Sequence, residues 1–332
     1  MKLCMIGTGY VGLVSGVCFA DLGNDVICID KDVNKINNLK KGTIPIYEPG
    51  LEEIIKRNVK SERLYFSDDI SLSIQKSQVI IIAVGTPQTS EGDANMEYVN
   101  SVLRAINKNL KDYKIICTKS TVPIGTGGRI IKTLTNDFEE GIDFDYVSNP
   151  EFLREGSAVK DFLWPDRIII GTTSDKAYEI MCDIYRPLYI NKNPIKHTTV
   201  ETAEMIKYAS NSFLALKISY INEIANLCET VGADIHDVAS AMGQDGRISD
   251  KFLHPGPGFG GSCFPKDLES LIAISKEKNI PMETLSAAKK ANINQKAKMG
   301  TKLEKLINAS LKDKKIAVLG LSFKANTDDV RE

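Results

Sequence analysis

The sequence has few of the residues that build metal sites and disulfide frameworks. Its 332 residues include three histidines, seven cysteines and one tryptophan. The cysteines are odd in number, widely spaced and without a CxxC pair, which argues against a zinc site and against a disulfide framework. The histidines are too dispersed to form an evident cluster. We therefore predict that the protein holds no metal.

The sequence also lacks long apolar runs and a charge excess. No apolar run approaches the ~20 residues that a membrane-spanning helix needs. The formal net charge is −1, which gives no reason to expect nucleic acid or an anionic membrane as a partner. The first residues lead directly into a predicted strand and leave no room for a signal peptide. We expect a soluble, cytoplasmic protein with about two domains.

The first half has the pattern of a dinucleotide-binding domain. A predicted strand at residues 2–6 leads into a glycine-rich turn and a helix, and a second strand at 25–29 ends in Asp30. The turn has the order GxGxxG, with Gly7, Gly9 and Gly12. Such glycines permit a tight turn and the close approach of a pyrophosphate. Asp30 could bind the adenosine ribose and would repel a 2′-phosphate, which favours NAD over NADP. A glycine-rich turn without a ligand is the alternative.

Further strands predict a doubly wound parallel sheet of the Rossmann-like α/β class. They lie at residues 78–84, 114–118, 146–148 and 167–171. Polar residues follow the carboxyl ends of these strands, among them Thr86, Thr121 and Glu151. In an open parallel sheet that edge is the binding crevice, so we expect these three residues to lie together. Thr86 and Thr121 could equally serve as helix caps.

One long helix is predicted at residues 199–231, where apolar residues recur with a period close to 3.6. Such a helix would span about 45 Å. It could join two domains and pair with a symmetry mate. Lys207 and Asn211 are four residues apart and therefore share a face. They form either a solvated stripe or part of a site.

Residues 259–267 have the layout of a reactive cysteine in a tight pocket. Cys263 follows two glycines and precedes Lys266 and Asp267. The glycines let a substrate approach the backbone. A cation at Lys266 would favour the nucleophilic thiolate, and the carboxylate of Asp267 could handle protons. A buried cysteine in a glycine-rich turn is the structural alternative.

The C-terminal residues resemble the beginning of another domain. Residues 315–321 form a strand-to-glycine pattern like that at residues 2–7. We predict the first strand of a second Rossmann-like domain, of which the chain lacks most. The predicted organisation is an NAD-binding domain at 1–198, a long helix with an all-helical domain that carries the cysteine at 199–300, and the start of the further Rossmann-like domain at 301–332.

Together these motifs resemble the nucleotide-sugar 6-dehydrogenases of the UDP-glucose/GDP-mannose dehydrogenase family. The resemblance rests on residues 7–12, 149–156, 255–267 and 320–324. It implies an NAD-dependent, two-step (four-electron) oxidation of a sugar's primary alcohol, through a thiohemiacetal and a thioester on Cys263. The loop at 255–264 is similar to that of the UDP-glucose branch, which implies oxidation of UDP-glucose to UDP-glucuronate. GDP-mannose and UDP-N-acetylmannosamine are alternative substrates.

The resemblance also implies roles for individual residues. Lys207 and Asn211 would stabilise oxyanions, Asp267 would position or deprotonate a water, Thr121 would contact the cofactor and water, and Glu151 would assist thioester hydrolysis. The implied NAD contacts come from the glycine-rich turn and from Tyr10, Val11, Asp30, Lys35, Thr86, Thr121, Glu155, Lys266 and Arg331. The implied sugar-nucleotide contacts are Glu151, Phe152, Leu153, Arg154, Glu155, Lys207, Asn211, Arg247, Phe252, Leu253, His254, Pro255, Gly256, Gly260 and Lys324.

The resemblance further implies that residues 199–300 form the dimerisation domain of a homodimer, in which Arg247 reaches the sugar site of the other subunit. It also implies that the domain starting at residue 301 binds UDP. A hypothesis of a different class also remains at this point. The chain could be a dimeric NAD-binding fragment without activity, because the predicted last domain is so short.

Overall fold

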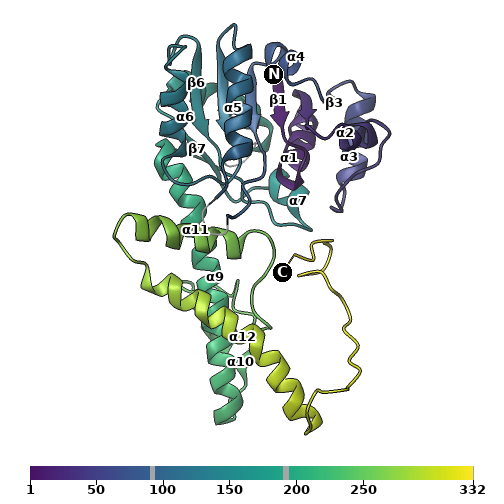
Figure 1. Ribbon diagram of the computed structural model, residues 1–332, viewed down its shortest axis with the longest axis vertical. Coiled ribbons are helices and arrows are strands. Elements are labelled where there is room, and N and C mark those ends of the chain that lie inside the picture. The colour runs from purple at the N-terminus through teal and green to yellow at the C-terminus, as the bar shows by residue number, and fades with distance from the viewer. Residues whose placement is uncertain (90–93, 190–193, 332) are drawn as a thin grey trace. The chain divides into compact units, whose positions relative to one another are not determined.

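The computed structural model describes residues 1–89, 94–189 and 194–331, which form two units. The first unit comprises Met1–Thr89, Ala94–Lys207 and Lys324–Asp328. The second comprises Tyr208–Phe323 and residues 329–331. Figure 1 shows a sheet covered by helices in the first unit, whereas the described part of the second consists of helices and loops.

The first unit is built on one eight-stranded sheet. Its order is β3-β2-β1-β4-β5-β6-β7-β8, and all neighbours are parallel except β6 and β7. The strands are β1 Lys2–Ile6, β2 Asp25–Ile29, β3 Leu64–Ser67, β4 Val79–Ile82, β5 Lys114–Thr118, β6 Phe144–Ser148, β7 Ile168–Gly171 and β8 Ile195–Thr198. The predicted Rossmann-like sheet is confirmed. The sequence prediction missed β3 and β8, and in β8 the side chains of Lys196 and His197 are exposed, so no apolar run marks it.

The central strands are buried on both faces, because helices cover each side of the sheet. Alternate residues of β1 enter different cores: Leu3 and Met5 face one, Cys4 and Ile6 the other. The first core includes residues of α1 Tyr10–Asp21, α2 Val33–Lys40, α3 Leu51–Lys60, α7 Ala158–Leu163 and α8 Asp175–Tyr185. The second includes residues of α4 Ile70–Lys76, α5 Glu97–Asn109 and α6 Thr126–Leu134. This two-layer covering explains the near-continuous apolar runs in the strands.

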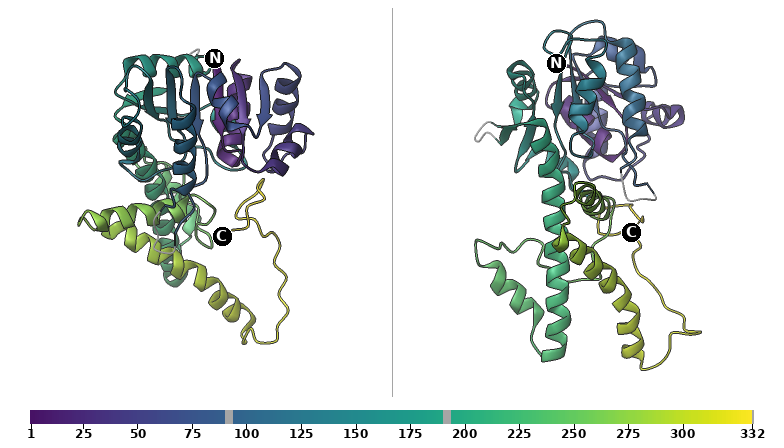
Figure 2. Two further views of the ribbon diagram at one scale, coloured as in Figure 1. Left: turned by 45° about the horizontal axis from the view of Figure 1, so that its top comes forward. Right: turned by 60° about the vertical axis from the view of Figure 1, so that its left-hand side comes forward.

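The second unit is helical. The long helix predicted at residues 199–231 is confirmed as α9, Val200–Val231, and the boundary between the two units falls within it, after Lys207. The other helices are α10 Ile235–Gly243, α11 Phe264–Glu277 and α12 Glu283–Ile307. In the right-hand view of Figure 2, α10 and α12 lie on opposite sides of α9. None of the described helices combines the length and hydrophobicity needed to cross a membrane.

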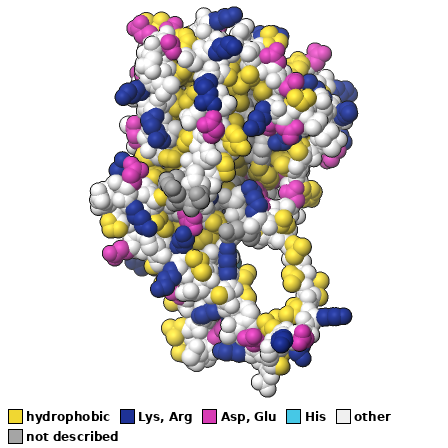
Figure 3. Space-filling view, viewed as in Figure 1, with side chains coloured by type: hydrophobic (Ala, Val, Ile, Leu, Met, Phe, Trp, Pro, Cys, Tyr) yellow, Lys and Arg dark blue, Asp and Glu magenta, His cyan; other side chains and the backbone are white. Residues whose placement is uncertain are grey.

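The structure has no strand at residues 315–321, contrary to the prediction of a first strand of a second Rossmann-like domain. A strand needs a neighbour to pair with its backbone, and this segment pairs with no described strand. Val318, Leu319 and Leu321 are 69%, 95% and 76% exposed, and Figure 3 shows hydrophobic side chains along the extended segment after α12. Residues 324–328 instead pack into the first unit.

Candidate active site

The glycine-rich turn has the geometry of a dinucleotide cradle. Gly7 has a φ of 105°, and a Cβ there would lie 2.5 Å from the Ala83 carbonyl oxygen. A Cβ on Gly12 would collide with the Gly7 carbonyl oxygen. Gly9 is the N-cap of α1 and supplies no side-chain cap, so the helix N-terminus is open to a phosphate. The residues therefore fit an NAD-type cofactor, which would rest on this turn.

Asp30 lies directly after β2, at the edge where the ribose is expected. Its Oδ2 accepts hydrogen bonds from Thr8 N at 3.0 Å and Thr8 Oγ1 at 2.7 Å, and Lys35 Nζ lies 3.3 Å away. Burial raises the pKa of Asp30, but the hydrogen bonds from Thr8 and Asp32 and the charge of Lys35 outweigh it, so the pKa lies below its ordinary value. Asp30 is thus a fixed carboxylate with Lys35 beside it.

The structure brings Thr86 and Thr121 together. Thr86 is buried and donates its hydroxyl hydrogen to the Thr121 carbonyl oxygen, 2.8 Å away. Both residues follow parallel strands, β4 and β5, which explains the contact. The side chain of Thr86 therefore supports the loop that carries Thr121.

Glu204 of α9 holds the next part of that loop, and the sequence prediction missed it. Its carboxylate accepts hydrogen bonds from Gly125 N at 2.6 Å and Gly127 N at 2.8 Å, at the start of α6. Burial raises the pKa of Glu204 to about 7, against the lowering effect of these hydrogen bonds. Glu204 lies three residues before Lys207 in the same helix, and this spacing could have indicated that both side chains lie on the same side of the helix.

Glu151 and Lys207 form a buried ion pair in the first unit. Lys207 Nζ lies 2.8 Å from Glu151 Oε1 and donates to the Glu151 carbonyl oxygen at 2.7 Å. The other carboxylate oxygen of Glu151 accepts from Leu153 N at 2.6 Å. Lys207 Nζ also lies 5.4 Å from the ring centroid of Phe152, over which Arg167 stacks at 4.1 Å. An ammonium held in this way is preorganised to stabilise negative charge on an oxygen.

Tyr10 and Glu48 link the dinucleotide turn to the segment at 149–156. The Tyr10 hydroxyl donates to Glu48, and Gly156 N lies 2.8 Å from both the Tyr10 hydroxyl oxygen and Glu48 Oε2. Burial raises the pKa of Glu48 above its ordinary value, although backbone hydrogen bonds oppose it. The sequence prediction missed Glu48, because it lies in a loop without a recognisable motif.

Lys324 returns to the first unit beside the same segment. Gly156 has a φ of 82°, and a Cβ there would lie 2.8 Å from the Asn326 carbonyl oxygen. Burial lowers the pKa of Lys324, and the neighbouring charge of Arg154 adds to this, while Glu155 acts in the opposite direction. Arg154 is exposed and forms an ion pair with Asp161 at 2.5 Å. The expected sugar-nucleotide residues Arg154, Glu155 and Lys324 are thus gathered in one region.

The cysteine motif lies in the second unit, around the start of α11. Cys263 is the N-cap residue of α11 and is half-buried. Asp267 is 1% exposed, and its two carboxylate oxygens are bound by Asn211 Nδ2 at 2.6 Å and Lys266 Nζ at 2.7 Å. The Ser262 hydroxyl lies 3.6 Å from Cys263 Sγ. Asn211, Lys266 and Asp267 therefore form one connected polar group beside the cysteine.

Five of the six other cysteines are more deeply buried than Cys263. Cys4, Cys18, Cys28, Cys117 and Cys228 are buried, and Cys182 is half-buried like Cys263. Burial raises the pKa of Cys28 and of Cys117 to about 12, which keeps those thiols protonated and unreactive.

The remaining predicted site residues lie in loops of the second unit. Gly256 is fixed by Asn222 and Gln295, at 2.7 and 2.8 Å, and Gly261 has a φ of 75° against the Phe323 ring. Arg247 is exposed and pairs with Asp245 at 2.6 Å. Phe252, Leu253, His254, Pro255 and Gly260 precede the cysteine, and Arg331 pairs with Asp329 at 2.7 Å.

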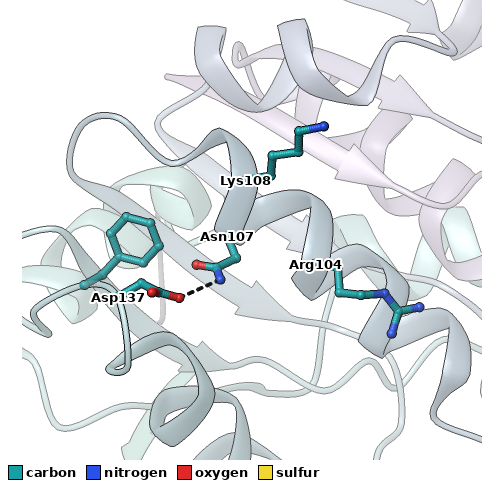
Figure 4. Close-up of a pocket in the computed structure, with 5 residues that line it drawn as sticks. Arg104, Asn107, Lys108 and Asp137 are labelled. Atoms are coloured by element: carbon teal, nitrogen blue, oxygen red, sulfur yellow. Dashed lines mark hydrogen bonds between the residues drawn. The ribbon is translucent and has the colours of Figure 1, made fainter.

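A pocket of about 500 Å³ on the first unit is lined by none of the candidate site residues. It is lined by Arg104, Asn107, Lys108, Asp137 and Phe138 (Figure 4). In the described residues, His, Cys, Asp and Glu side chains form no group of three or more that could hold a metal ion.

Residues 1–189 match the NAD-binding domain, and residues 201–294 the central domain, of the UDP-glucose/GDP-mannose dehydrogenase family. A UDP-glucose 6-dehydrogenase of Rhizobium meliloti is 51% identical over 335 residues, which cover 100% of this chain and 76% of the relative. That coverage does not support the prediction that the chain lacks most of a C-terminal UDP-binding domain.

Two solved structures show the same fold. A UDP-glucose dehydrogenase from Pyrobaculum islandicum aligns with a TM-score of 0.91 at 39% identity, over 99% of this chain and 76% of that chain. A UDP-D-ManNAc dehydrogenase from Pyrococcus horikoshii aligns with a TM-score of 0.89 at 29% identity, over 100% of this chain and 78% of that chain.

Proposed function

Because the chain belongs to the UDP-glucose/GDP-mannose dehydrogenase family, we propose that it oxidises the 6-hydroxyl of UDP-glucose twice to give UDP-glucuronate. The observation that carries the proposal is the 51% identity to a UDP-glucose 6-dehydrogenase over the whole chain. The turn of Gly7, Gly9 and Gly12 would hold NAD, which would supply the hydride acceptor for each oxidation. The overall reaction consumes one water and two NAD and releases two NADH and three protons.

Cys263 is the proposed nucleophile. Its thiolate adds to the aldehyde carbon formed in the first oxidation, and the aldehyde oxygen becomes the hydroxyl of a thiohemiacetal. Loss of a hydride and a proton from that adduct gives the thioester. Water then adds to the thioester carbon, and the thiolate leaves as the carboxylate forms. The N-terminal end of α11 supports this role, because it favours negative charge on the sulfur of its N-cap residue.

The polar groups have proposed roles that match their chemistry. Lys207 stabilises the oxyanions, and Asn211 donates to the same oxygen. Asp267 takes the proton of the attacking water, Thr121 contacts the cofactor and this water, and Glu151 assists thioester hydrolysis. Arg154, Glu155 and Lys324 contact the nucleotide sugar. We assign residues 1–198 to the NAD-binding domain and 199–300 to the helical domain with the cysteine, while 301–332 contribute Lys324 and Arg331 to ligand binding.

The stoichiometry of the reaction tests this function. With excess NAD, the protein is expected to form two NADH for each UDP-glucose consumed, measured by absorbance together with quantification of the sugar. One NADH per sugar would mean that the reaction stops at the aldehyde and that Cys263 does not act as proposed. No NADH would contradict the activity itself.

A second nucleotide sugar is the competing proposal. The similarity to a UDP-D-ManNAc dehydrogenase structure at a TM-score of 0.89 supports it, although the identity of 29% is lower than that of the UDP-glucose dehydrogenase. A panel of UDP-glucose, GDP-mannose and UDP-N-acetylmannosamine discriminates the two proposals. A higher kcat/KM with either mannose-type sugar would overturn the choice of UDP-glucose.

We also propose that the protein forms a homodimer through α9. Phe213, Tyr220 and Leu227 are spaced by seven residues, so they lie along one side of the helix. Their side chains are 60%, 49% and 58% exposed, so this side of the helix presents a line of large hydrophobic side chains to solvent. A second copy of the chain could bury this stripe by symmetric packing, since a two-fold axis brings the same surface from both subunits together.

Replacing Leu227 with lysine is expected to weaken the dimer by about 100-fold or more, because each subunit then loses a buried leucine and gains a charge at the contact. Analytical ultracentrifugation over a range of concentrations measures the change. Ile280→Lys is the matched control, since Ile280 is 69% exposed but lies outside α9. A variant at Leu227 that keeps the wild-type association constant would contradict the assignment of this face.

A further inference from the structure

Lys119 is a buried cation with neutral partners. It follows the last residue of β5 and is 4% exposed. Its Nζ lies 3.1 Å from Asn149 Oδ1 and 3.2 Å from the Tyr185 hydroxyl. The ring centroids of Phe19, Phe162 and Tyr185 each lie 5.9 Å away. Within the described residues, no carboxylate forms a salt bridge with it.

Such a group destabilises the folded state when it is charged, because burial removes its hydration. Burial lowers the pKa of Lys119 to about 8; the nearby charge of Lys207 also lowers it, while Cys117 and Glu151 act in the opposite direction. At pH 7 the side chain of Lys119 is therefore mostly in its charged, protonated form. A methionine would fill a similar volume without this cost, so the lysine needs another explanation.

The contacts of Lys119 lead to the candidate active site. Asn149 Oδ1 accepts from Lys119 and from the Tyr185 hydroxyl at 2.6 Å, while Asn149 Nδ2 donates to the Ile169 carbonyl at 2.7 Å. The backbone N–H of Asn149 donates to the Thr118 carbonyl at 2.9 Å. Asn149 thus joins β5, β7 and α8, and it begins the turn that carries Glu151 two residues later.

We propose that Lys119 is a positioning residue for the reaction: its buried ammonium holds Asn149 and thereby fixes the turn that carries Glu151 beside Lys207. The inference rests on the proposed function, in which Glu151 and Lys207 act on the oxidised sugar carbon. It does not require Lys119 to touch a substrate.

The same strand offers a matched control. Lys114 is the first residue of β5, is 1% exposed, and donates to the Ser77 carbonyl at 2.7 Å with Asp112 at 2.8 Å. It lies at the amino end of the strand, whereas ligands bind at the carboxyl end of parallel strands. Lys114→Met therefore removes a buried ammonium from β5 without disturbing the turn at Asn149.

The experiment compares Lys119→Met and Lys114→Met in steady-state kinetics and thermal unfolding. We expect Lys119→Met to lower kcat by about 10- to 100-fold, as small misplacements of catalytic groups do, with a change in KM for NAD below about twofold and a Tm at pH 7 equal to or above that of the wild type. Lys114→Met is expected to keep its kcat. A kcat within about twofold of the wild type for Lys119→Met would overturn the proposal.

The pH dependence of stability gives an independent readout. The folded pKa of about 8 lies below the ordinary value of 10.5, so the unfolded state binds more protons between these values. The wild type should therefore gain stability relative to Lys119→Met as the pH rises from 8 to 10.5, and the Tm difference should shrink. The charged or titratable groups facing Lys119 are Cys117, Glu151, Lys207 and Tyr185. A Tm difference that does not change with pH would show that no buried ammonium is present.

A second variant and the activity of the wild type distinguish failure of this inference from failure of the proposed function. If Lys119→Met does not fold, Asn149→Ala removes the amide oxygen that accepts the hydrogen bond from Lys119; an unchanged kcat in that variant would overturn the proposal, because Glu151 would then be positioned without Asn149. If the wild type itself forms no NADH from UDP-glucose, the proposed function fails. If the wild type is active and neither variant loses kcat, only the inference about Lys119 fails.

Discussion

Replacing Cys263 with serine is expected to lower the rate of UDP-glucuronate formation by on the order of 10³-fold or more. A serine hydroxyl is a weak nucleophile without an adjacent base, so the covalent adduct with the aldehyde forms slowly. Cys263 gains from its place at the N-cap of α11, where the helix favours a negative charge on sulfur but does little for a neutral hydroxyl. The measurement is NADH formation with saturating NAD and UDP-glucose.

Cys182→Ser is the matched control, because Cys182 is the other half-buried cysteine described in the structure. We expect it to keep its rate within about twofold, as surface substitutions away from a site usually do. The dissociation constant for NADH, measured by calorimetry, should be unchanged in both variants. A Cys263→Ser variant that releases UDP-glucuronate at the wild-type rate would rule out the covalent route.

The sheet of the first unit could be predicted because its central strands are buried on both faces. The predicted ranges 2–6, 25–29 and 114–118 coincide with β1, β2 and β5, whose residues are mostly buried. Residues 315–321 show the limit of the same reasoning, because an apolar run forms a strand only where a neighbouring strand can pair with it. Pairing depends on the rest of the fold, and hydrophobicity along the chain does not report it.

Contacts between distant residues were the part of the site that the sequence could not supply. Lys207 and Asn211 were predicted as neighbours on a helix, but their partners Glu151 and Asp267 are each 56 residues away. Lys119 follows an apolar strand and is followed by Ser120, and nothing in that local pattern distinguishes a buried ammonium from a solvated one. The surroundings of its ammonium include three aromatic rings from other elements.

Replacing Lys207 with methionine is expected to reduce both activity and stability. The loss of a preorganised cation beside a developing oxyanion should lower kcat by about 10²- to 10³-fold. Lys207 is 3% and Glu151 5% exposed, and removal of one partner of a buried ion pair costs about 3–5 kcal/mol of unfolding free energy. Urea denaturation measures this loss, and steady-state kinetics measures the change in kcat.

The double variant Lys207→Met with Glu151→Gln separates the two effects. A neutral amide in place of the carboxylate removes the uncompensated charge and can still accept the hydrogen bond from Leu153 N. We therefore expect the double variant to recover most of the lost unfolding free energy but none of the lost activity, because neither proposed catalytic group is present. If activity returned together with stability, the effect of Lys207 on the rate would have come from folding alone, and its assignment as the oxyanion-stabilising cation would be wrong.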